Sequence, residues 1–203
     1  YDKVGTNPEE SVMRMNMDLV EFSESVLAIF REQDKGKEYI FVSSENRMFY
    51  NADAVKLESI LNNLISNASK YTSEGDSIIL SLSKDEASGL VVLKLTDTGT
   101  GISADELPYI FQRFYQSPTN STGKEGSGIG LNMARNYARL MGGDIVVESE
   151  LGKGTSFSVL LPAEYICADG GDGSSAEAVN AEDKALVVIV EDNQTIAGFI
   201  ADL

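Results

Sequence analysis

The sequence predicts an α/β sandwich of two layers, in which a mixed and mostly antiparallel sheet is covered on one face by helices. Three segments place apolar residues three and four positions apart, which is the spacing of an amphipathic helix. They are residues 18–32, 57–71 and 131–141. Four other segments alternate apolar with polar residues, or run apolar, between turn-forming residues, as strands do. They are residues 77–83, 90–96, 145–148 and 155–160.

The first part of the chain predicts a helix, a hairpin and a second helix. The helix 18–32 ends in a polar run. Two short β-prone runs, 39–42 and 47–50, then flank a polar tetrapeptide, which favours a hairpin that leads into the long helix. Asn51 and Asp53 are the candidate caps of that long helix.

The middle of the chain predicts a loop between the central strands and the last helix. Residues 107–114 have only two turns of apolar spacing. Residues 116–125 are rich in small, turn-forming residues and have no periodic apolar pattern, so we expect a mobile loop there. The helix 131–141 follows and ends at Gly142 and Gly143.

Composition divides the chain into four parts. We expect residues 1–16 to be a linker or the tail of a preceding segment, and residues 17–165 to form one domain. Residues 166–184 are rich in glycine, serine and acidic residues, which predicts a flexible linker. Residues 185–203 begin with an unbroken apolar run, typical of a strand buried in a parallel sheet. We expect that run to begin a second domain.

Composition also narrows the function. The chain has 16 basic and 32 acidic residues, a formal net charge of −16, so we expect no nucleic acid as a partner, because nucleic acid requires a basic face. It has no histidine, which removes the commonest general base and metal ligand. Its single cysteine, Cys167, excludes an internal disulfide framework. No apolar run approaches the roughly 18 residues that span a bilayer, and we read the chain as a cytoplasmic piece of a longer protein.

The helix 57–71 carries a polar stripe beside its apolar one. Asn63, Asn67 and Lys70 follow one another at spacings of four and three, so they share one side of the helix at the rim of the core. Asparagines also serve as caps and turn residues, but two of them one turn apart inside a helix oppose local propensity. An amide oxygen is a good ligand for Mg²⁺, and a nearby lysine supplies positive charge for a phosphate. The stripe therefore suggests a nucleotide.

Two glycine-containing segments suggest further parts of a nucleotide site. Asp97 ends a strand and is followed by Gly99 and Gly101, where a flat ligand can approach the backbone closely. Its carboxylate suits the exocyclic amine of adenine, although an aspartate that caps a turn gives the same pattern. The segment 126–131 places three glycines immediately before a helix, where free amides and the positive helix end can receive phosphate oxygens.

These motifs occur in one order along the chain: the asparagine-rich helix, DTGTGI, FQRF at 111–114, and GSGIGL. In this order they resemble the ATP-binding catalytic domain of sensor histidine kinases, within the wider superfamily of gyrase, chaperone and MutL-like ATPases. The resemblance covers residues 17–161. It implies the histidine-kinase or gyrase-type fold for the predicted sandwich, with ATP and magnesium as cofactors.

The resemblance also implies a role for each motif residue. Within the helix, Asn67 would bind magnesium, Lys70 a phosphate and Tyr71 the adenine ring, with Asn63 as the companion amide. Asp97 would read adenine. The other implied nucleotide contacts are Gly99, Gly101, Ile102, Gly126, Ser127, Gly128, Ile129, Gly130, Leu131 and Thr155.

Two cations near the loop complete the implied catalytic set. They are Arg113 and Lys124, which join Asn63, Asn67 and Lys70. Many relatives carry arginine where this chain has Gln116, so the residue that reaches the terminal phosphate stays open.

The segment VVIVEDN resembles the opening of a receiver domain, in which Glu191 and Asp192 would belong to an acidic magnesium site. An ordinary strand with an acidic cap gives the same pattern. Together the two resemblances imply a hybrid histidine kinase. Its implied partners are ATP, a histidine-bearing dimerisation domain outside this chain and a receiver domain, and the full-length protein would be a membrane-anchored homodimer.

The sequence therefore predicts a domain that binds Mg-ATP and donates the γ-phosphoryl group to a histidine on another domain. The first alternative is an ATPase of the gyrase, chaperone or MutL class. Such an enzyme activates water with a glutamate one turn before the magnesium asparagine, whereas Asn63 occupies that position and an amide cannot accept the proton. The second alternative is a nucleotide-binding scaffold without transfer activity. Intact Asn67, Asp97 and glycines 126–130 argue against it.

Overall fold

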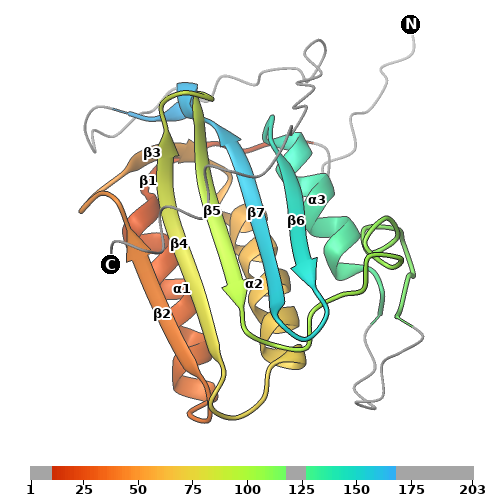
Figure 1. Ribbon diagram of the computed structural model, residues 1–203. Coiled ribbons are helices and arrows are strands. Elements are labelled where there is room, and N and C mark those ends of the chain that lie inside the picture. The colour runs from red at the N-terminus through yellow and green to blue at the C-terminus, as the bar shows by residue number, and fades with distance from the viewer. Residues whose placement is uncertain (1–10, 118–126, 168–203) are drawn as a thin grey trace, which may run out of the picture.

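Three α-helices cover one face of a five-stranded sheet in the computed structural model, which describes residues 11–117 and 127–167 (Figure 1). The helices are α1 (Leu19–Gln33), α2 (Ala54–Tyr71) and α3 (Gly130–Leu140). The strands, in their order across the sheet, are β2 (Glu38–Ser43), β4 (Ser77–Asp85), β5 (Leu90–Asp97), β7 (Gly154–Pro162) and β6 (Asp144–Glu150). Strands β2 and β4 are parallel, and the other neighbours are antiparallel. The predicted fold class is confirmed.

A second, two-stranded sheet corrects the predicted hairpin. Strand β3 (Phe49–Ala52) pairs antiparallel with β1 (Met15–Asp18), while β2 pairs with β4. The hairpin was wrong because its two strands bury aromatic side chains in different places. Tyr39 of β2 is buried in the core of the main sheet, whereas the Tyr50 hydroxyl donates to the carbonyl of Pro162 at 2.9 Å. A hairpin between residues 39–42 and 47–50 would not bring the Tyr39 and Tyr50 rings to these two separate positions.

Residues 13–16 belong to the described fold. The Arg14 guanidinium lies 3.8 Å from the ring centroid of Tyr165, in the short 3₁₀ turn η1 (Ala163–Tyr165). The backbone N–H of Met13 donates to the Asp53 carboxylate at 3.0 Å. Asp53 also caps the start of α2, as predicted, whereas the other candidate cap, Asn51, lies within β3. Both contacts tie the start of the described chain to the main domain.

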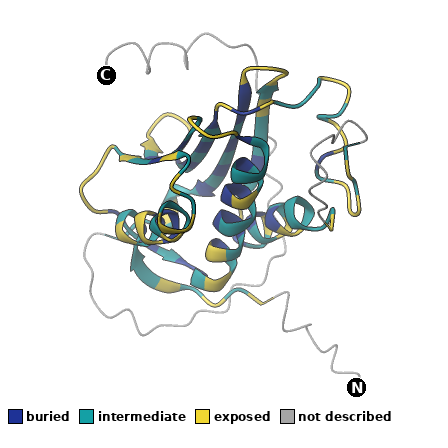
Figure 2. Ribbon diagram, turned by 90° about the horizontal axis from the view of Figure 1, so that it is seen from below, coloured by how far each residue is buried: buried dark blue, intermediate teal, exposed yellow. Residues whose placement is uncertain are grey.

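The apolar stripe of α2 forms the centre of the core. Its buried members are Leu57, Ile60, Leu61, Leu64, Ile65 and Ala68. Buried side chains of the sheet, such as Leu80 and Leu93, belong to the same cluster, and burial of each leucine or isoleucine stabilises the fold by about 1.5–3 kcal/mol. Figure 2 shows the buried faces of the helices turned inward and their exposed faces turned outward. None of the described helices is long and apolar enough to cross a membrane. This packing fixes the rotation of α2, and with it the direction of the polar stripe.

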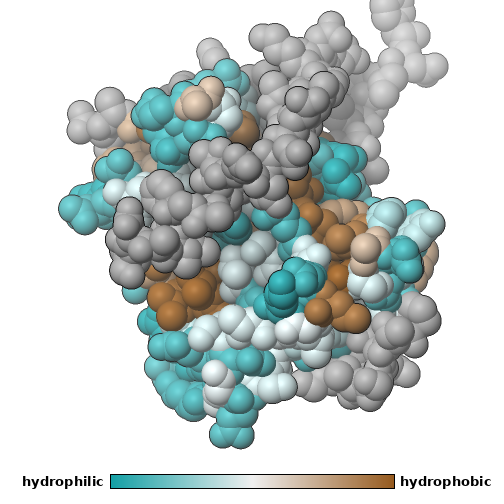
Figure 3. All heavy atoms as spheres, viewed as in Figure 1, coloured by the Kyte–Doolittle hydropathy of each residue, from teal (hydrophilic) through white to brown (hydrophobic). Residues whose placement is uncertain are grey.

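None of the helices in residues 11–117 and 127–167 covers the opposite face of the sheet. Figure 3 views this face and shows separate apolar patches between polar side chains. Thr96 of β5 and Ser156 of β7 are cross-strand neighbours here, and their hydroxyl oxygens lie 2.9 Å apart. Their neighbours Asp97 and Thr155, one position along each strand, therefore face the helices.

An ion-pair cluster fastens α3 to the start of β6. Arg135 donates two hydrogen bonds to Asp144, at 2.7 and 2.9 Å, and Arg139 also contacts this carboxylate. Burial alone would raise the pKa of Asp144, but the hydrogen bonds from the two arginines lower it to about 2. The Arg135 guanidinium also lies 4.6 Å from the ring centroid of Phe111. Helix α3 is thus held to the sheet and to the segment that precedes residue 118.

Candidate functional site

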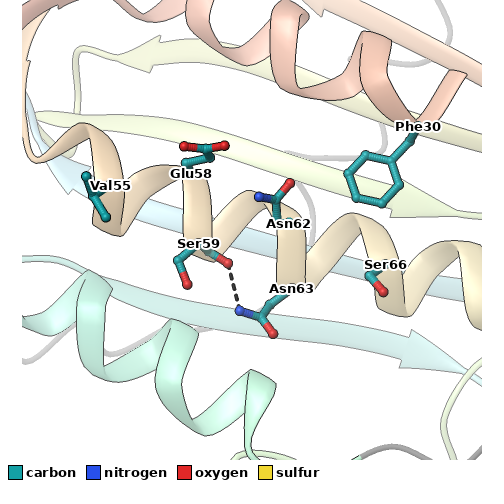
Figure 4. A pocket seen from close by; sticks show the side chains of 7 residues that line it. All are labelled: Phe30, Val55, Glu58, Ser59, Asn62, Asn63 and Ser66. Atoms are coloured by element: carbon teal, nitrogen blue, oxygen red, sulfur yellow. Dashed lines mark hydrogen bonds between the residues drawn. The ribbon is translucent and has the colours of Figure 1, made fainter. Parts of the chain in front are cut away.

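The polar stripe of α2 presents amide and ammonium groups beside the core. Asn63, Asn67 and Lys70 are half-buried. The Asn63 side-chain NH₂ donates to the Ser59 carbonyl at 2.7 Å, which leaves its amide oxygen for another contact. Among the described residues, the Asn67 side chain has no hydrogen-bond partner and Lys70 has no carboxylate within 4.0 Å. In Figure 4, Asn63 points from α2 toward the α3 side, while Asn62 points toward α1.

The start of α3 lies against this stripe. A Cβ atom at Gly130, the first residue of α3, would lie 2.3 Å from the Asn63 amide oxygen, so a larger residue there would have to displace the Asn63 side chain. The helix has no side-chain cap at Ile129 and no acidic residue in its first turn. Its first N–H groups and the positive end of its dipole therefore lie beside Asn63, in an arrangement suited to bind an anion.

Asp97 is a buried carboxylate at the end of β5. Its side chain is 6% exposed, and one of its oxygens accepts from the Gly99 N–H at 2.9 Å. Burial raises the pKa of Asp97, against the opposing effect of the Gly99 and Thr155 N–H groups, and the negative charge of Asp76 adds to the rise. No lysine or arginine pairs with it among the residues described. A buried carboxylate without a cation is costly, so this position favours a ligand that donates hydrogen bonds.

The loop after Asp97 is held from two sides. On one side, the Thr100 N–H donates to the carbonyl of Tyr71 at 3.1 Å, and a Cβ atom at Gly99 would lie 2.3 Å from that carbonyl oxygen. On the other side, Gly101 has a φ of +69°, and a Cβ atom there would lie 2.1 Å from the Glu150 carbonyl oxygen. The end of α2, the glycine loop and the turn between β6 and β7 therefore meet at one place.

Sequence reasoning missed one residue of this region, Ser149. Its hydroxyl accepts from the Ile102 N–H at 2.8 Å and lies 2.9 Å from the Thr155 hydroxyl. Ser149 pairs with Thr155, and Thr155 pairs with Asp97, in neighbouring strands. The alternation of β6 could have indicated it, because positions 145, 147 and 149 share the face that carries Ile145 into the core.

The two flanks of the segment 118–126 are tied together. The Phe114 N–H donates to the Gly128 carbonyl at 2.8 Å. The Asn132 side chain of α3 donates to the Phe111 carbonyl at 2.9 Å. The predicted loop lies mostly outside the described residues, but the flanking residues Phe114 and Gly128 are joined close to the start of α3.

The remaining predicted site residues are partly exposed, partly packed on the core and partly outside the described ranges. Arg113 is exposed, and its guanidinium lies 5.0 Å from the ring centroid of Phe114. Ile102 and Leu131 are half-buried and pack on the core, so they support the site by packing. Ser127 accepts a hydrogen bond from the Ile129 N–H at 3.3 Å. Four residues assigned from the sequence lie outside the described ranges: Lys124, Gly126, Glu191 and Asp192.

A groove between α1 and α2 leads to Asn63 from outside. It has a volume of about 530 Å³ and is lined by Phe30 of α1 and by Glu58, Ser59, Asn62 and Asn63 of α2, among others (Figure 4). Of the predicted nucleotide contacts, only Asn63 lines it. The groove is therefore separate from the place where Asp97 lies.

Any metal at this site would depend on amide and phosphate oxygens. In the described part of the chain, no group of three histidine, cysteine, aspartate or glutamate residues could hold a metal ion. Mg²⁺ usually keeps several waters and binds through one or two protein groups plus substrate phosphates. The amide oxygen of Asn67, which has no partner in the described ranges, fits that role.

Comparison with known proteins agrees with this geometry. Residues 52–165 match the family described as histidine kinase-, DNA gyrase B-, and HSP90-like ATPase. The sensor protein SrrB of Staphylococcus aureus (strain NCTC 8325 / PS 47) is 39% identical over 136 residues, which cover 66% of this chain but only 23% of SrrB. The chain thus spans about a quarter of the length of this curated relative.

Solved structures show the same fold. The mycobacterial sensor histidine kinase MprB superposes with a TM-score of 0.64 at 24% identity, over 73% of this chain and 97% of that one. Full-length ShkA, in complex with AMPPNP, superposes with a TM-score of 0.64 at 30% identity, over 73% of this chain and 31% of ShkA. ThkA, in complex with the response regulator protein TrrA, superposes with a TM-score of 0.62 at 21% identity, over 75% and 42%.

Proposed function

Because this chain belongs to the family of histidine kinase-, DNA gyrase B-, and HSP90-like ATPases, we propose that it is the Mg-ATP-binding catalytic domain of a sensor histidine kinase. The observation that carries the proposal is the buried carboxylate of Asp97, which has no cation partner among the described residues and lies at the end of the glycine loop. Adenine offers an amine donor to such a group. The similarity to SrrB, and the AMPPNP complex of ShkA, support the choice of a kinase that uses ATP.

The residues of the site act by positioning and by charge. Asp97 accepts from the adenine amine, and Tyr71 and the glycine loop enclose the base. The start of α3 and Lys70 stabilise the phosphates, because both carry positive charge. Magnesium, held by Asn67 with Asn63 beside it, would neutralise charge on the phosphate oxygens. In the transfer step an imidazole nitrogen forms a bond to the γ-phosphorus, while the bond from that phosphorus to the ADP oxygen breaks.

The accepting imidazole must come from another domain, because this chain contains no histidine. We propose that it belongs to a dimerisation domain of the full-length protein, which would be a membrane-anchored homodimer with this domain in the cytoplasm. The complex of ThkA with the response regulator TrrA supports a response regulator as the later partner. Residues 185–203, with Glu191 and Asp192, would be the start of a receiver domain, which makes the protein a hybrid kinase.

Transfer to histidine is favoured over hydrolysis because of Asn63. Its NH₂ donates to the Ser59 carbonyl, and its oxygen faces Gly130, so no group at this position can take a proton from water. We therefore expect the isolated chain to bind ATP in a magnesium-dependent manner and to hydrolyse it far more slowly than the median enzyme rate of about 10 s⁻¹.

The test is a calorimetric titration of the purified chain with ATP, with and without magnesium, alongside a steady-state assay of released phosphate. Binding with little phosphate release supports the proposal. Rapid turnover that is abolished by Asn67→Ala would support an ATPase of the gyrase class instead. Absence of ATP binding would contradict both functions.

A further inference from the structure

Strand β3 pairs on both of its edges with segments from the two ends of the described fold. Residues 11–18, the entry segment, include β1, which pairs antiparallel with β3 along one edge. Residues 163–167, the exit segment, lie along the other edge. There Ile166 pairs antiparallel with Tyr50, which on its opposite edge pairs with Met17. One short strand thus holds the chain where it enters the described fold and where it leaves it.

A cation–π contact joins the two segments. The Arg14 guanidinium of the entry segment lies 3.8 Å from the ring centroid of Tyr165 in the exit segment. Its Nη2 donates to the Met141 carbonyl at 3.3 Å, whereas its Nη1 is buried and has no hydrogen-bond partner in the described ranges. The Tyr165 ring therefore offsets part of the cost of burying this guanidinium, and a cation–π contact is strongest where water is excluded.

The exit segment is anchored in the core through Tyr50. This residue is 1% exposed, and its ring meets the Tyr165 ring edge to face, with the centroids 6.1 Å apart. The Tyr50 hydroxyl donates to the Pro162 carbonyl, just before the exit segment, at 2.9 Å. At the other end of the segment, the Cys167 N–H donates to the Phe49 carbonyl at 2.7 Å. Tyr165 thus contacts both a buried residue of the core and the entry segment.

The entry segment depends on its pairing with β3 and on Arg14. No residue of β1 is fully buried, and a two-stranded pairing is only marginally stable by itself in water. The Met13 N–H adds one hydrogen bond, to the Asp53 carboxylate at 3.0 Å. The contact of Arg14 with Tyr165 therefore connects a weakly held segment to one that is anchored in the core.

We propose that the exit segment is a clasp on the entry segment, in which Tyr165 holds Arg14 and the two segments open and close together. This makes residues 163–167 a regulatory joint, because displacement of the exit segment also releases the chain that leads into β1. The reverse holds as well, since coupling between two sites is reciprocal. The inference goes beyond nucleotide binding and does not depend on it.

Amide hydrogen exchange of the purified chain, without nucleotide, measures this coupling. Tyr165→Leu keeps an apolar side chain beside Tyr50 but removes the ring that contacts Arg14, so exchange at the Met13 amide should become about tenfold faster. Arg14→Gln should accelerate exchange at the Cys167 amide by a similar factor, because the coupling is reciprocal. In each variant the reporting amide belongs to the segment that was not changed.

Two controls separate the clasp from its surroundings and from a general loss of stability. Arg47→Gln removes an exposed cation near β1 that lies outside the clasp. Lys37→Gln removes the hydrogen bonds that Lys37 donates to Asp34 and Ser69, and so destabilises another part of the fold. Neither control should change exchange at either reporting amide.

Faster exchange confined to the segment that carries the substitution would overturn the inference, and so would an equal acceleration in Lys37→Gln. If Tyr165→Leu does not fold, Arg14→Gln read at the Cys167 amide provides the test. In the double variant, the Met13 amide should exchange no faster than in Arg14→Gln alone, because the contact is already lost. A further acceleration there would show that Tyr165 acts on the entry segment without Arg14, and would contradict the clasp.

Discussion

Asp97→Asn should weaken ATP binding by about ten- to a hundredfold while it leaves the ligand-free protein as stable as the wild type, or more so. Affinity falls because the amide replaces an acceptor by a donor, and a hydrogen bond to a charged group contributes roughly 1.5–3 kcal/mol. Stability does not fall because the pKa of Asp97 is raised above its ordinary value of 3.8 by burial. The ionised carboxylate therefore costs stability at pH 7, and the neutral amide removes this cost.

Calorimetry with ATP and thermal melting without it measure both effects. The matched control is Asp105→Asn, which changes an exposed carboxylate and should change neither value. Weaker binding together with a lower melting temperature would mean that Asp97 is a structural cap of the glycine loop. Unchanged binding would exclude Asp97 as the group that binds adenine.

Asn67→Ala should reduce phosphoryl transfer by about a hundredfold or more, because it removes the amide that we propose holds magnesium against the charge of the phosphates. The fold should be unaffected, since the half-buried side chain has no hydrogen-bond partner in the described ranges. Asn62→Ala is the control on the same helix, because Asn62 points toward α1 instead (Figure 4). The transfer rate should fall in Asn67→Ala and stay at the wild-type value in Asn62→Ala. The melting curves of both variants should match that of the wild type. A large loss of stability in Asn67→Ala would instead assign this asparagine to helix packing.

The periodicity of α2 was enough to predict both of its stripes. A helix with one continuous apolar stripe has a single way to face a sheet, so the direction of the polar stripe follows. The row of Asn63, Asn67 and Lys70 could therefore be named from the sequence. Strands β4, β5, β6 and β7 were predicted for a similar reason, because their alternation specifies one buried face.

Contacts between distant segments could not be predicted in this way. The predicted hairpin was wrong because β2 pairs with β4 and β3 pairs with β1. The spacing of residues within a short segment does not indicate such distant pairing partners. The close approach of Gly130 to Asn63 depends on how α3 packs on α2, which no local pattern encodes. Ser149 was missed because the alternation of β6 indicates only the face on which it lies, and not its register with Thr155.

The central claim, that this domain phosphorylates a histidine on another domain, is tested most directly by following the γ-phosphoryl group of labelled ATP. The chain is incubated with magnesium and a histidine-bearing dimerisation domain of a sensor kinase, supplied as a separate polypeptide. We expect acid-labile, base-stable label on the added domain and none on this chain, which has no histidine. Replacement of the acceptor histidine by alanine should abolish the label. Release of the label as free phosphate at a high rate, with none on the histidine of the added domain, would contradict the account.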